Sequence, residues 1–463
     1  MAVEGRGLGS RLAQDVARAG KLGNLSIPES VQKLQRALQA KAKEKPDLRF
    51  YALYDKVYRE DVLAYAYASC KANDGAAGVD GQSFEDIEGY GRERWLGELA
   101  QELKEKKYQP QAVRRVFIPK RGGSGRRPLG IPTIRDRTAQ MAVVLVLGPI
   151  FEADLPPEQH AYRPERDALS AVNQVHGLLR AGYTQVIDAD LSAYFDNIPH
   201  LELMKSVARR VVDSAMLHLI QMWLQAPVEE DDEGGGRKRT SRNRDEKRGI
   251  PQGSPLSPLL SNIYMRRFVL GWKSLGWARR YKAQIVNYAD DFVICCKGNA
   301  AQALEAMRQL MGRLRLTVNE EKTHLCRIPE EHFDFLGYTF GRRYSPKTGR
   351  AYLGMGPSKK SVRRQIESIH EKTVRQRCGL DAAVVVQELN EGLRGWANYY
   401  RLGTISKIYQ RLDDYATQRL RRWLCCKHKL RGGTRRYPDE YLYGNLGLVR
   451  LRVLRRNSPW ATA

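Results

Sequence analysis

Two pairs of aspartates in this chain have a spacing that could build a metal site. Asp188 and Asp190 lie two residues apart at the end of a short apolar run, so they share one face of the strand predicted there. Asp290 and Asp291 fall between two apolar arms that predict a β-hairpin over residues 284–296. Because apolar arms drive a hairpin into a core, the tip that carries these two aspartates is expected to be rigid.

Bare carboxylates at such a tip repel each other, by roughly 4 kcal/mol for unit charges 4 Å apart at an effective dielectric constant of 20. A divalent cation removes this cost, and Mg²⁺ prefers one or two carboxylates together with substrate phosphates. Two such ions about 4 Å apart can activate an attacking oxygen and stabilise a leaving oxygen in phosphoryl transfer. Taken alone, however, two aspartates in a hairpin turn are more often solvated turn residues.

The composition points to a polyanionic partner. The 463 residues include 78 Lys and Arg against 52 Asp and Glu, a net charge of +26, and nucleic acid is the commonest polyanion. No apolar run reaches the ~18–20 residues of a membrane span, and the N-terminus lacks an apolar secretory core, so we expect a cytosolic protein. Seven cysteines without a CxxC pair indicate reduced thiols rather than disulfides or a zinc ribbon.

Sequence periodicity predicts a mixture of helices and hairpins, which is typical of an α+β fold. Residues 1–27 are interpreted as a mobile basic extension, and residues 229–247, acidic then glycine-rich then basic, as an exposed and disordered insertion. We expect Ser30 to cap the first helix. Helices are predicted over residues 31–43, 51–72, 136–151, 166–179, 201–224, 301–316 and 358–428. Strands are predicted over residues 114–119, from 126, over 186–189 and in the hairpin 284–296.

Several runs, in a fixed order along the chain, resemble the motifs of reverse transcriptases. The run YADD at residues 288–291 is similar to their active-site box, and RGIPQGSPLSPLLSN at 248–262 resembles the motif that precedes it. The remaining runs are RRVFIPK at 114–120, RPLGIP at 127–132, ADLSAYFDNI at 189–198, NEEKT at 319–323 and FDFLGY at 333–338. The order makes chance a poor explanation, and it favours metal binding over turn chemistry for the aspartates.

Other runs are similar to one subfamily, the group II intron-encoded reverse transcriptases with a maturase domain. NDGAAGVDG at residues 73–81 resembles their N-terminal loop over the template, and GWANYYR at 395–401 resembles their maturase region. The endings KHK at 427–429 and NSPW at 457–460 are also similar. We do not expect the HNH endonuclease domain of some members here, since no Cys/His ligand cluster follows the maturase region.

The resemblance implies a right-hand polymerase with fingers, palm and thumb, followed by an α-helical maturase domain. The expected organisation is a basic N-terminal extension over residues 1–50, fingers over 51–180 with the template loop 73–81, a palm over 181–345 with the insertion 229–247, a helical thumb and maturase domain over 346–426, and a basic nucleic-acid-binding tail over 427–463.

The resemblance also implies roles for the residues of the catalytic motifs. Asp190, Asp290 and Asp291 should bind two Mg²⁺ ions, with the carbonyl of Leu191 as a further ligand. Asp188 and Asp196 are expected to support the strand and its turn instead. The residues expected to bind the incoming dNTP are Arg114, Lys120, Arg127, Phe195, Gln252, Gly253, Ser254 and Lys322.

Among these residues, Phe195 occupies the position of the family's steric gate, which selects deoxynucleotides, and Lys322 is the expected proton donor to pyrophosphate. Arg126 competes with Arg127 for the triphosphate because the turn before them is one residue longer than expected. An ordinary surface cation is the alternative for each basic residue of so basic a chain, and core packing is the alternative for Phe195.

Template, primer or RNA contacts are expected from the N-terminal loop, the motif AYRP at residues 161–164, Tyr288 and the C-terminal helices. The last 70 residues, 394–463, hold 16 basic and 4 acidic residues. Leu389, Leu393, Trp396 and Tyr400 are predicted to be core residues. The predicted contacts are Asn73, Gly75, Gly78, Gly81, Arg163, Tyr288, Lys359, Lys360, Arg363, Arg364, Arg421 and Arg422.

Three functions are compatible with these observations. The first is an RNA-directed DNA polymerase that also binds its intron RNA as a splicing maturase and supports retrohoming, with an RNA template, a DNA or RNA primer, dNTPs and target DNA as partners in the bacterial cytosol or nucleoid. The second is a domesticated relative that acts in DNA repair or in phage or CRISPR defence. The third is an RNA-binding splicing cofactor whose main role is not enzymatic; the intact carboxylates argue against it.

Overall fold

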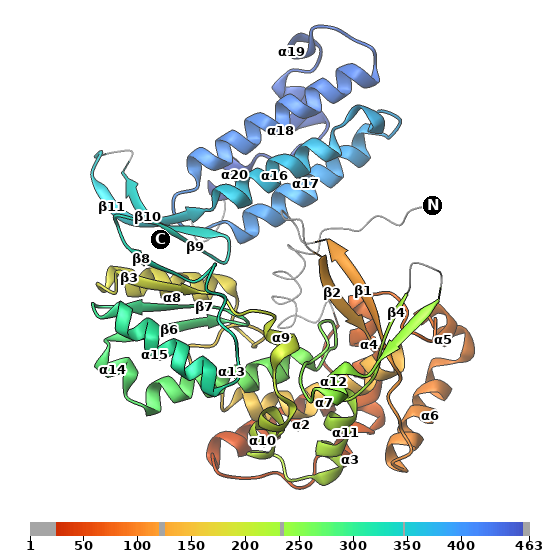
Figure 1. Ribbon diagram of the computed structural model, residues 1–463. Coiled ribbons are helices and arrows are strands. Elements are labelled where there is room, and N and C mark those ends of the chain that lie inside the picture. Colours follow the sequence, from red (N-terminus) through yellow and green to blue (C-terminus); the bar gives the residue numbers. More distant parts are fainter. Residues whose placement is uncertain (1–24, 120–125, 232–235, 346–347, 457–463) are drawn as a thin grey trace. The chain divides into compact units, whose positions relative to one another are not determined.

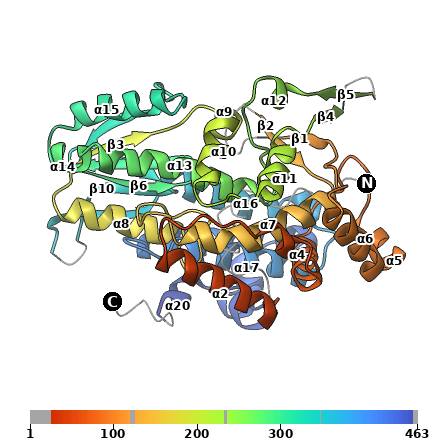
Figure 2. The ribbon, with the colours of Figure 1, turned by 90° about the horizontal axis from the view of Figure 1, so that it is seen from below.

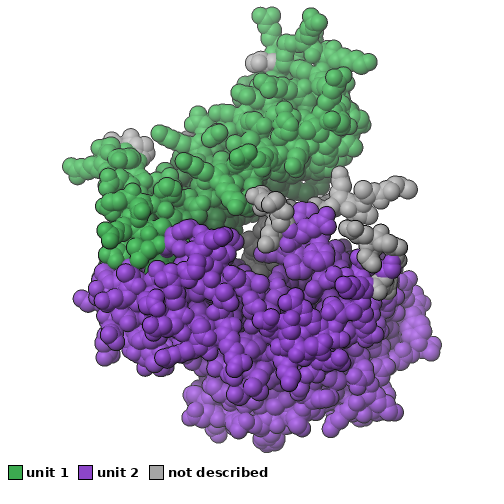
Figure 3. Space-filling view, viewed as in Figure 1, with its two compact units in different colours: residues 1–10, 169–188, 325–463 green, residues 11–168, 189–324 purple. Residues whose placement is uncertain are grey.

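The computed structural model describes residues 25–119, 126–231, 236–345 and 348–456 of the chain (Figure 1). The chain divides into two compact units, which Figure 3 shows in different colours. Unit 2 comprises the described residues of 11–168 and 189–324, and unit 1 those of 169–188 and 325–456. The boundaries proposed for fingers, palm and thumb stay a prediction.

The first half of unit 2 is a group of helices around α7 (Ile134–Glu152). Most residues of this helix are buried, including the polar Asp136, Arg137 and Gln140, so it forms the centre of the group. Figure 2 shows α2 (Glu29–Glu44) and α4 (Glu60–Asn73) packed alongside it. The other helices of this group are α3 (Tyr54–Val57), α5 (Phe84–Tyr90) and α6 (Arg92–Lys104).

Two details of this group correct the sequence prediction. Pro28, not Ser30, occupies the N-cap position of α2, and no side chain caps that helix. The helix predicted over residues 51–72 is broken in two, because Arg59 adopts an extended conformation between α3 and α4. The fully buried Val31 anchors α2 in the core of unit 2.

A four-stranded sheet with the order β2-β1-β4-β5 lies in the same unit (Figure 1). Strands β1 (Val113–Pro119) and β2 (Arg126–Ile131) form the predicted antiparallel pair. Strand β4 (Val228–Asp231) pairs in parallel with β1 and antiparallel with β5 (Arg237–Thr240), and a short helix, α12 (Arg242–Asp245), follows.

The prediction of a disordered insertion over residues 229–247 is therefore wrong for its described part. The acidic run is a strand whose charges have partners on β1: Arg115 lies 3.0 Å from Glu230, and Arg114 lies 3.4 Å from Asp231. Ladder hydrogen bonds and these ion pairs together satisfy a segment whose composition alone is typical of disorder.

The second half of unit 2 contains the hairpin of β6 (Ala283–Tyr288) and β7 (Asp291–Cys296), as predicted. Phe268 of α13 (Ser257–Ser274) packs on Phe292 of the hairpin, with ring centroids 5.1 Å apart. The helix predicted over residues 201–224 is two helices, because Asp213 caps the second one. The remaining helices are α9 (Tyr194–Asn197), α10 (His200–Ala208), α11 (Ser214–Leu224), α14 (Trp277–Arg280) and α15 (Ala300–Arg313).

Unit 1 combines strands with a helical C-terminal part. Strand β10 (Tyr338–Tyr344) pairs with both β9 (Phe333–Phe335) and β11 (Ala351–Pro357). Its main helices are α8 (Ala168–Arg180), α16 (Lys359–Lys372), α17 (Ala382–Tyr399), α18 (Ser406–Lys427) and α20 (Leu451–Arg456). Shorter elements are β3 (Gln185–Ala189), β8 (His324–Arg327), α19 (Gly433–Arg436) and the single turns Arg375–Arg377 and Tyr441–Asn445. The unit boundary falls within β3 and β8.

The helical part of unit 1 has its own core. Leu389, Leu393 and Trp396 are buried there as predicted, whereas Tyr400 is half-buried at its edge. The buried carboxylate of Asp413 accepts the backbone N–H of Leu451 at 2.8 Å and thereby holds α20 to α18.

Candidate active site

The hairpin tip is a tight turn at the position that the sequence predicts. Tyr288 and Asp291 are paired across the two strands, so Ala289 and Asp290 form a two-residue turn. Ala289 adopts a left-handed conformation with φ 57°, which is uncommon for a non-glycine residue and is often seen at functional sites. The buried side chain of Asn287 donates a hydrogen bond to the carbonyl of Ala289 at 2.7 Å. Asn287, which the sequence analysis did not single out, thus holds the turn in place.

Asp190 follows β3 directly and is held by the segment around residue 319. The backbone N–H of Asn319 donates to the carbonyl of Asp190 at 2.8 Å. The side-chain amide of Asn319 lies 3.2 Å from the Asp190 Oδ2, and the Lys322 ammonium lies 3.3 Å from the same oxygen. Leu191 faces Val318 across an isolated bridge whose hydrogen bonds come from the flanking residues, so the Leu191 carbonyl points away from that segment.

The carboxylates of Asp190 and Asp290 lie close enough for one to affect the pKa of the other. Burial raises the pKa of Asp290, the Asp190 carboxylate raises it further, and Arg127 lowers it. A half-buried carboxylate beside a second one suits a divalent cation, which would offset both desolvation and repulsion. Within the described ranges, no three His, Cys, Asp or Glu side chains already form a metal cluster. Asp190 is turned toward Lys322, whose positive charge lies beside the carboxylate instead.

Two tyrosines line the site. Burial raises the pKa of Tyr162, Asp290 and Asp291 raise it as well, and Arg127 lowers it, so this side chain lies among the charged groups of the site. Tyr288 is half-buried, and its hydroxyl has no hydrogen-bond partner in the described part of the chain. The sequence analysis selected Arg163 of the motif AYRP, but in the structure its neighbour Tyr162 lies beside the aspartates.

Of the residues predicted to surround the nucleotide, Arg127 lies near the aspartates, Arg114 pairs elsewhere, and Lys120 lies outside the described residues. Arg127 is a main contributor to the pKa of both Asp290 and Tyr162, which favours it over its competitor Arg126 as the cation at the site. Phe195 is half-buried against Tyr194, with ring centroids 5.5 Å apart. Lys120 lies outside the described residues, and Arg114 is drawn to the acidic strand β4 as given above.

The turn at residues 252–254 is docked on strand β2. The backbone N–H of Gly130 donates to the carbonyl of Gln252 at 2.7 Å, and Gly253 has φ 122°. A Cβ on Gly253 would lie only 2.5 Å from the carbonyl oxygen of Gly130, so glycine is required there. The Ser254 hydroxyl is buried and donates to the Gln140 side chain at 2.7 Å, so this side chain is engaged within the protein, and nucleotide binding by the turn stays a prediction.

Arg163 does not have the predicted role of a template contact. Its side chain is 6% exposed and pairs with Glu152 at 2.7 Å. The remaining guanidinium N–H groups donate to backbone carbonyls, those of Pro156 and Gln159 at 2.7 and 2.8 Å among them. Because every donor has an internal acceptor, this arginine organises the loop around it.

The N-terminal loop contacts the protein itself. Arg137 of α7 donates to the carbonyl of Ala76 at 2.9 Å, and a Cβ on Gly78 would lie 2.7 Å from the backbone of Thr133. Close packing on α7 therefore explains Gly78. Gly75 has φ 141°, Gly81 has open space around it, and Asn73 ends α4, so their predicted template contacts stay predictions.

On unit 1 the predicted RNA contacts divide by exposure. Lys359, Lys360, Arg363 and Arg364 are all exposed on α16, and Arg422 is exposed on α18. Arg421 is different: its guanidinium donates to the carbonyl of Tyr437 at 2.8 Å and to Asp439 at 2.7 Å, with 15% of the side chain exposed. This arginine holds the segment that follows α18, and its predicted RNA contact stays a prediction.

Comparison with known proteins places the site in a class. Residues 118–340 match the family model described as "Reverse transcriptase (RNA-dependent DNA polymerase)", and residues 360–441 match "Group II intron, maturase-specific domain". No helix within the described residues has the length and apolarity needed to cross a membrane.

Two curated relatives align with about two thirds of this chain. Protein YkfC of Escherichia coli K12 is 33% identical over 353 residues, 68% of this chain and 89% of YkfC. The group II intron-encoded protein LtrA of Lactococcus lactis subsp. cremoris is 28% identical over 365 residues, 66% of this chain and 59% of LtrA. The alignment thus spans less than two thirds of the length of LtrA. A solved partial Cas6-RT-Cas1–Cas2 complex aligns with 57% of this chain and 41% of that one, at 23% identity and a TM-score of 0.34.

The reverse transcriptase match contains Asp190 and both hairpin aspartates, so the α+β fold is that of a right-hand polymerase and the site is of the reverse transcriptase class. The second match adds the maturase-specific helices to this domain. The chain belongs to the family of group II intron reverse transcriptases with a maturase domain.

Proposed function

We propose that this protein is an RNA-directed DNA polymerase in which Asp190, Asp290 and Asp291 hold two Mg²⁺ ions. The observation that supports this most strongly is the half-buried Asp290 on a two-residue turn, beside a second carboxylate that raises its pKa further. Bound Mg²⁺ would activate the primer 3′-hydroxyl and stabilise the leaving pyrophosphate. The carbonyl of Leu191, which points away from its neighbouring segment, is the proposed further ligand.

The protein's own residues then position and select the nucleotide. Arg127 binds the triphosphate, and the backbone of residues 252–254 supports the primer terminus and the base. Phe195 stands beside the sugar and excludes a 2′-hydroxyl. Lys322, two-thirds exposed and 3.3 Å from Asp190, is placed to give a proton to pyrophosphate. The Lys322 ammonium pairs with Asp190 in this structure. A metal ion bound to Asp190 would replace that pairing and free Lys322 to donate the proton.

Primer extension on an RNA template tests the proposal directly. Asp290→Asn keeps the size of the side chain and removes its charge, so we expect DNA synthesis to fall at least a hundredfold at saturating Mg²⁺. Asp47→Asn, at an exposed position in a turn, is the matched control and should synthesise DNA like the wild type. Wild-type synthesis by Asp290→Asn would overturn the assignment of this carboxylate as a metal ligand.

We also propose that the protein binds its intron RNA as a splicing maturase and supports retrohoming into target DNA in the bacterial cytosol. The maturase-specific match supports this, together with the charge of residues 358–456, which hold 23 Lys and Arg against 9 Asp and Glu. Structured RNA is recognised largely through its shape, 2′-hydroxyls and phosphates.

A splicing assay with the flanking intron RNA separates the two roles. The intron RNA supplies the chemistry of splicing, so we expect Asp290→Asn to restore splicing at moderate Mg²⁺ concentration while it makes no cDNA. Loss of both activities in this variant, with wild-type folding by circular dichroism, would contradict independent roles.

A further inference from the structure

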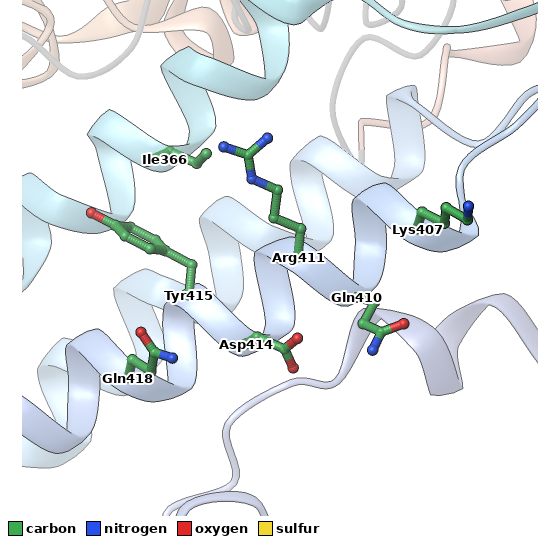
Figure 4. Close-up of a pocket in the computed structure, with 7 residues that line it drawn as sticks. All are labelled: Ile366, Lys407, Gln410, Arg411, Asp414, Tyr415 and Gln418. Atoms are coloured by element: carbon green, nitrogen blue, oxygen red, sulfur yellow. The ribbon is translucent and has the colours of Figure 1, made fainter.

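A groove on the helical part of unit 1 has the chemistry of a nucleotide-binding site. It has a volume of about 460 Å³ and lies between α16 and α18, as Figure 4 shows. Ile366 of α16 and Tyr415 of α18 are half-buried and pack against the helical core, so they form its apolar floor. The other residues that line it are exposed polar residues of α18, namely Lys407, Gln410, Arg411, Asp414 and Gln418.

Most polar groups of this groove are available to a ligand; Asp414 is the exception and lies 3.9 Å from Arg452. Within the part of the chain that the structure describes, Lys407, Arg411 and the two glutamines have no hydrogen bond or ion pair. Other cations of the same helix do: Arg419 donates to the carbonyl of Thr373 at 2.8 Å. The structure thus uses the cations on the other faces of α18 internally and leaves those of the groove without internal partners.

The mixture of groups favours one class of ligand. Two cations suit phosphate oxygens, but an apolar floor with an aromatic ring suits a flat base that stacks on it. Amide side chains such as Gln410 and Gln418 match the donor and acceptor edges of a nucleobase. The volume lies in the usual range of small-ligand sites, roughly 300–1,000 Å³. A protein partner would instead require a larger apolar surface than Ile366 and one tyrosine ring provide.

The same face of α18 continues beyond the groove. Arg411, Tyr415, Gln418 and Arg422 follow at intervals of four, three and four residues, so they share one stripe of the helix, about 16 Å long at 1.5 Å per residue. Arg422 helps to line a second, smaller cavity of about 170 Å³ together with Arg375 and Arg419. A chain whose base enters the groove would therefore meet further cations along this stripe.

We propose that the groove between α16 and α18 binds one unpaired nucleotide of a structured RNA, with Tyr415 stacked on the base and Arg411 and Lys407 on its phosphates. The proposal rests on the maturase function proposed above, and it deepens that function by naming the RNA feature that this surface reads. A bulged or flipped-out base presents its faces and edges in this way, whereas a base within a duplex does not.

A short RNA hairpin with a single bulged 2-aminopurine, compared with the same hairpin fully paired, tests the proposal on the full-length protein. Affinity is measured by fluorescence anisotropy, and stacking by quenching of the 2-aminopurine. Base–aromatic stacking is worth ~1–3 kcal/mol, so we expect the wild type to prefer the bulged hairpin at least fivefold and to quench its fluorescence. Tyr415→Leu keeps an apolar side chain on the floor and should abolish both the preference and the quenching.

Two further variants separate charge from stacking. Arg411→Gln should weaken binding of both hairpins and reduce the slope of log affinity against log salt by about 0.7–0.9. Arg394→Gln removes an equally exposed cation from α17, outside the groove, and should leave the preference for the bulge at its wild-type value. Circular dichroism of each variant establishes that it is folded.

The outcomes distinguish this proposal from the one on which it rests. A wild-type protein that copies RNA and binds both hairpins equally would overturn the groove proposal alone. A Tyr415→Leu protein that keeps the preference would also overturn it, because the bulge would then be bound elsewhere on the protein. An equal preference for the bulge in a DNA hairpin would overturn the assignment to RNA. If the wild type bound neither hairpin, both this proposal and the maturase function would fail.

Discussion

Gly253 should be among the least replaceable residues of the site, and Gly253→Ala tests why. Its φ of 122° belongs to a region that other residues rarely adopt, at a cost of roughly 1–3 kcal/mol. A Cβ there would also lie 2.5 Å from the carbonyl oxygen of Gly130, and overpacking of this kind typically costs about 1–3 kcal/mol more. The neighbour is backbone on β2, so relief requires that the strand itself moves.

Movement of β2 has a catalytic consequence. Arg127 lies three residues before Gly130 on that strand, and its charge reaches Asp290. We therefore expect Gly253→Ala to raise the KM for dNTP about tenfold or more, which corresponds to a loss of ~1.4 kcal/mol in binding. An increase in KM larger than the decrease in kcat would identify nucleotide binding as the affected step.

Gly276→Ala is the matched control. Gly276 also has a positive φ, of 71°, but open space surrounds the position of its Cβ, so only the backbone cost of about 1–2 kcal/mol applies. Urea unfolding should show Gly253→Ala to be less stable than this control by about 1–3 kcal/mol, and primer extension with varied dNTP should show a defect in Gly253→Ala alone. Equal stabilities together with wild-type KM for dNTP would refute the reasoning.

Three further predictions concern groups whose environment the structure defines. Arg163→Ala should cost about 3–5 kcal/mol in urea unfolding, because it leaves the carboxylate of Glu152, 18% exposed, without its partner; lower template affinity at unchanged stability would contradict this. Burial raises the pKa of Asp136 to about 6, above the value of ~3.9 in the unfolded chain, so protonation stabilises the native state. This contribution to the free energy of unfolding is full below about pH 4 and is lost as the pH rises through 6, by up to about 3 kcal/mol. Asp136→Asn should remove this difference in stability between pH 4 and 7. The same pH dependence of unfolding in the wild type and the variant would refute the prediction. Log affinity for a primer–template should fall with log salt at a slope of about −7 to −9 if roughly ten phosphates are neutralised, whereas a nearly flat dependence would exclude extended backbone contacts.

Local pattern was sufficient for the hairpin that carries the aspartates. Its arms alternate little and are apolar on both faces, and the polar turn between them is short, so strand, turn and strand were all predictable over residues 284–296. The support of the turn was not predictable in the same way. The amide of Asn287 points back to the carbonyl of Ala289, and one asparagine in an apolar strand gives no sign of that contact.

Charged segments were the hardest to interpret, because the partner of a charge lies elsewhere in the chain. The acidic residues after position 228 were expected to be solvated, yet β4 pairs with β1, more than a hundred residues away. Composition measures how many charges a segment has, and disorder follows only when no complementary strand is available to it. Arg115, on β1, provides one such complement.

The same argument limits what a net charge of +26 can mean for nucleic-acid binding. Arg163, Arg419 and Arg421 already donate to carboxylates or carbonyls of the protein, so they contribute to the charge of the chain but are poor candidates for phosphate contacts. Each phosphate contact releases counterions, and only cations that meet phosphate do so. The salt slope therefore reports the exposed cations of α16 and of the α18 groove, and it should fall with substitutions there and not with Arg421→Gln, although each removes one positive charge.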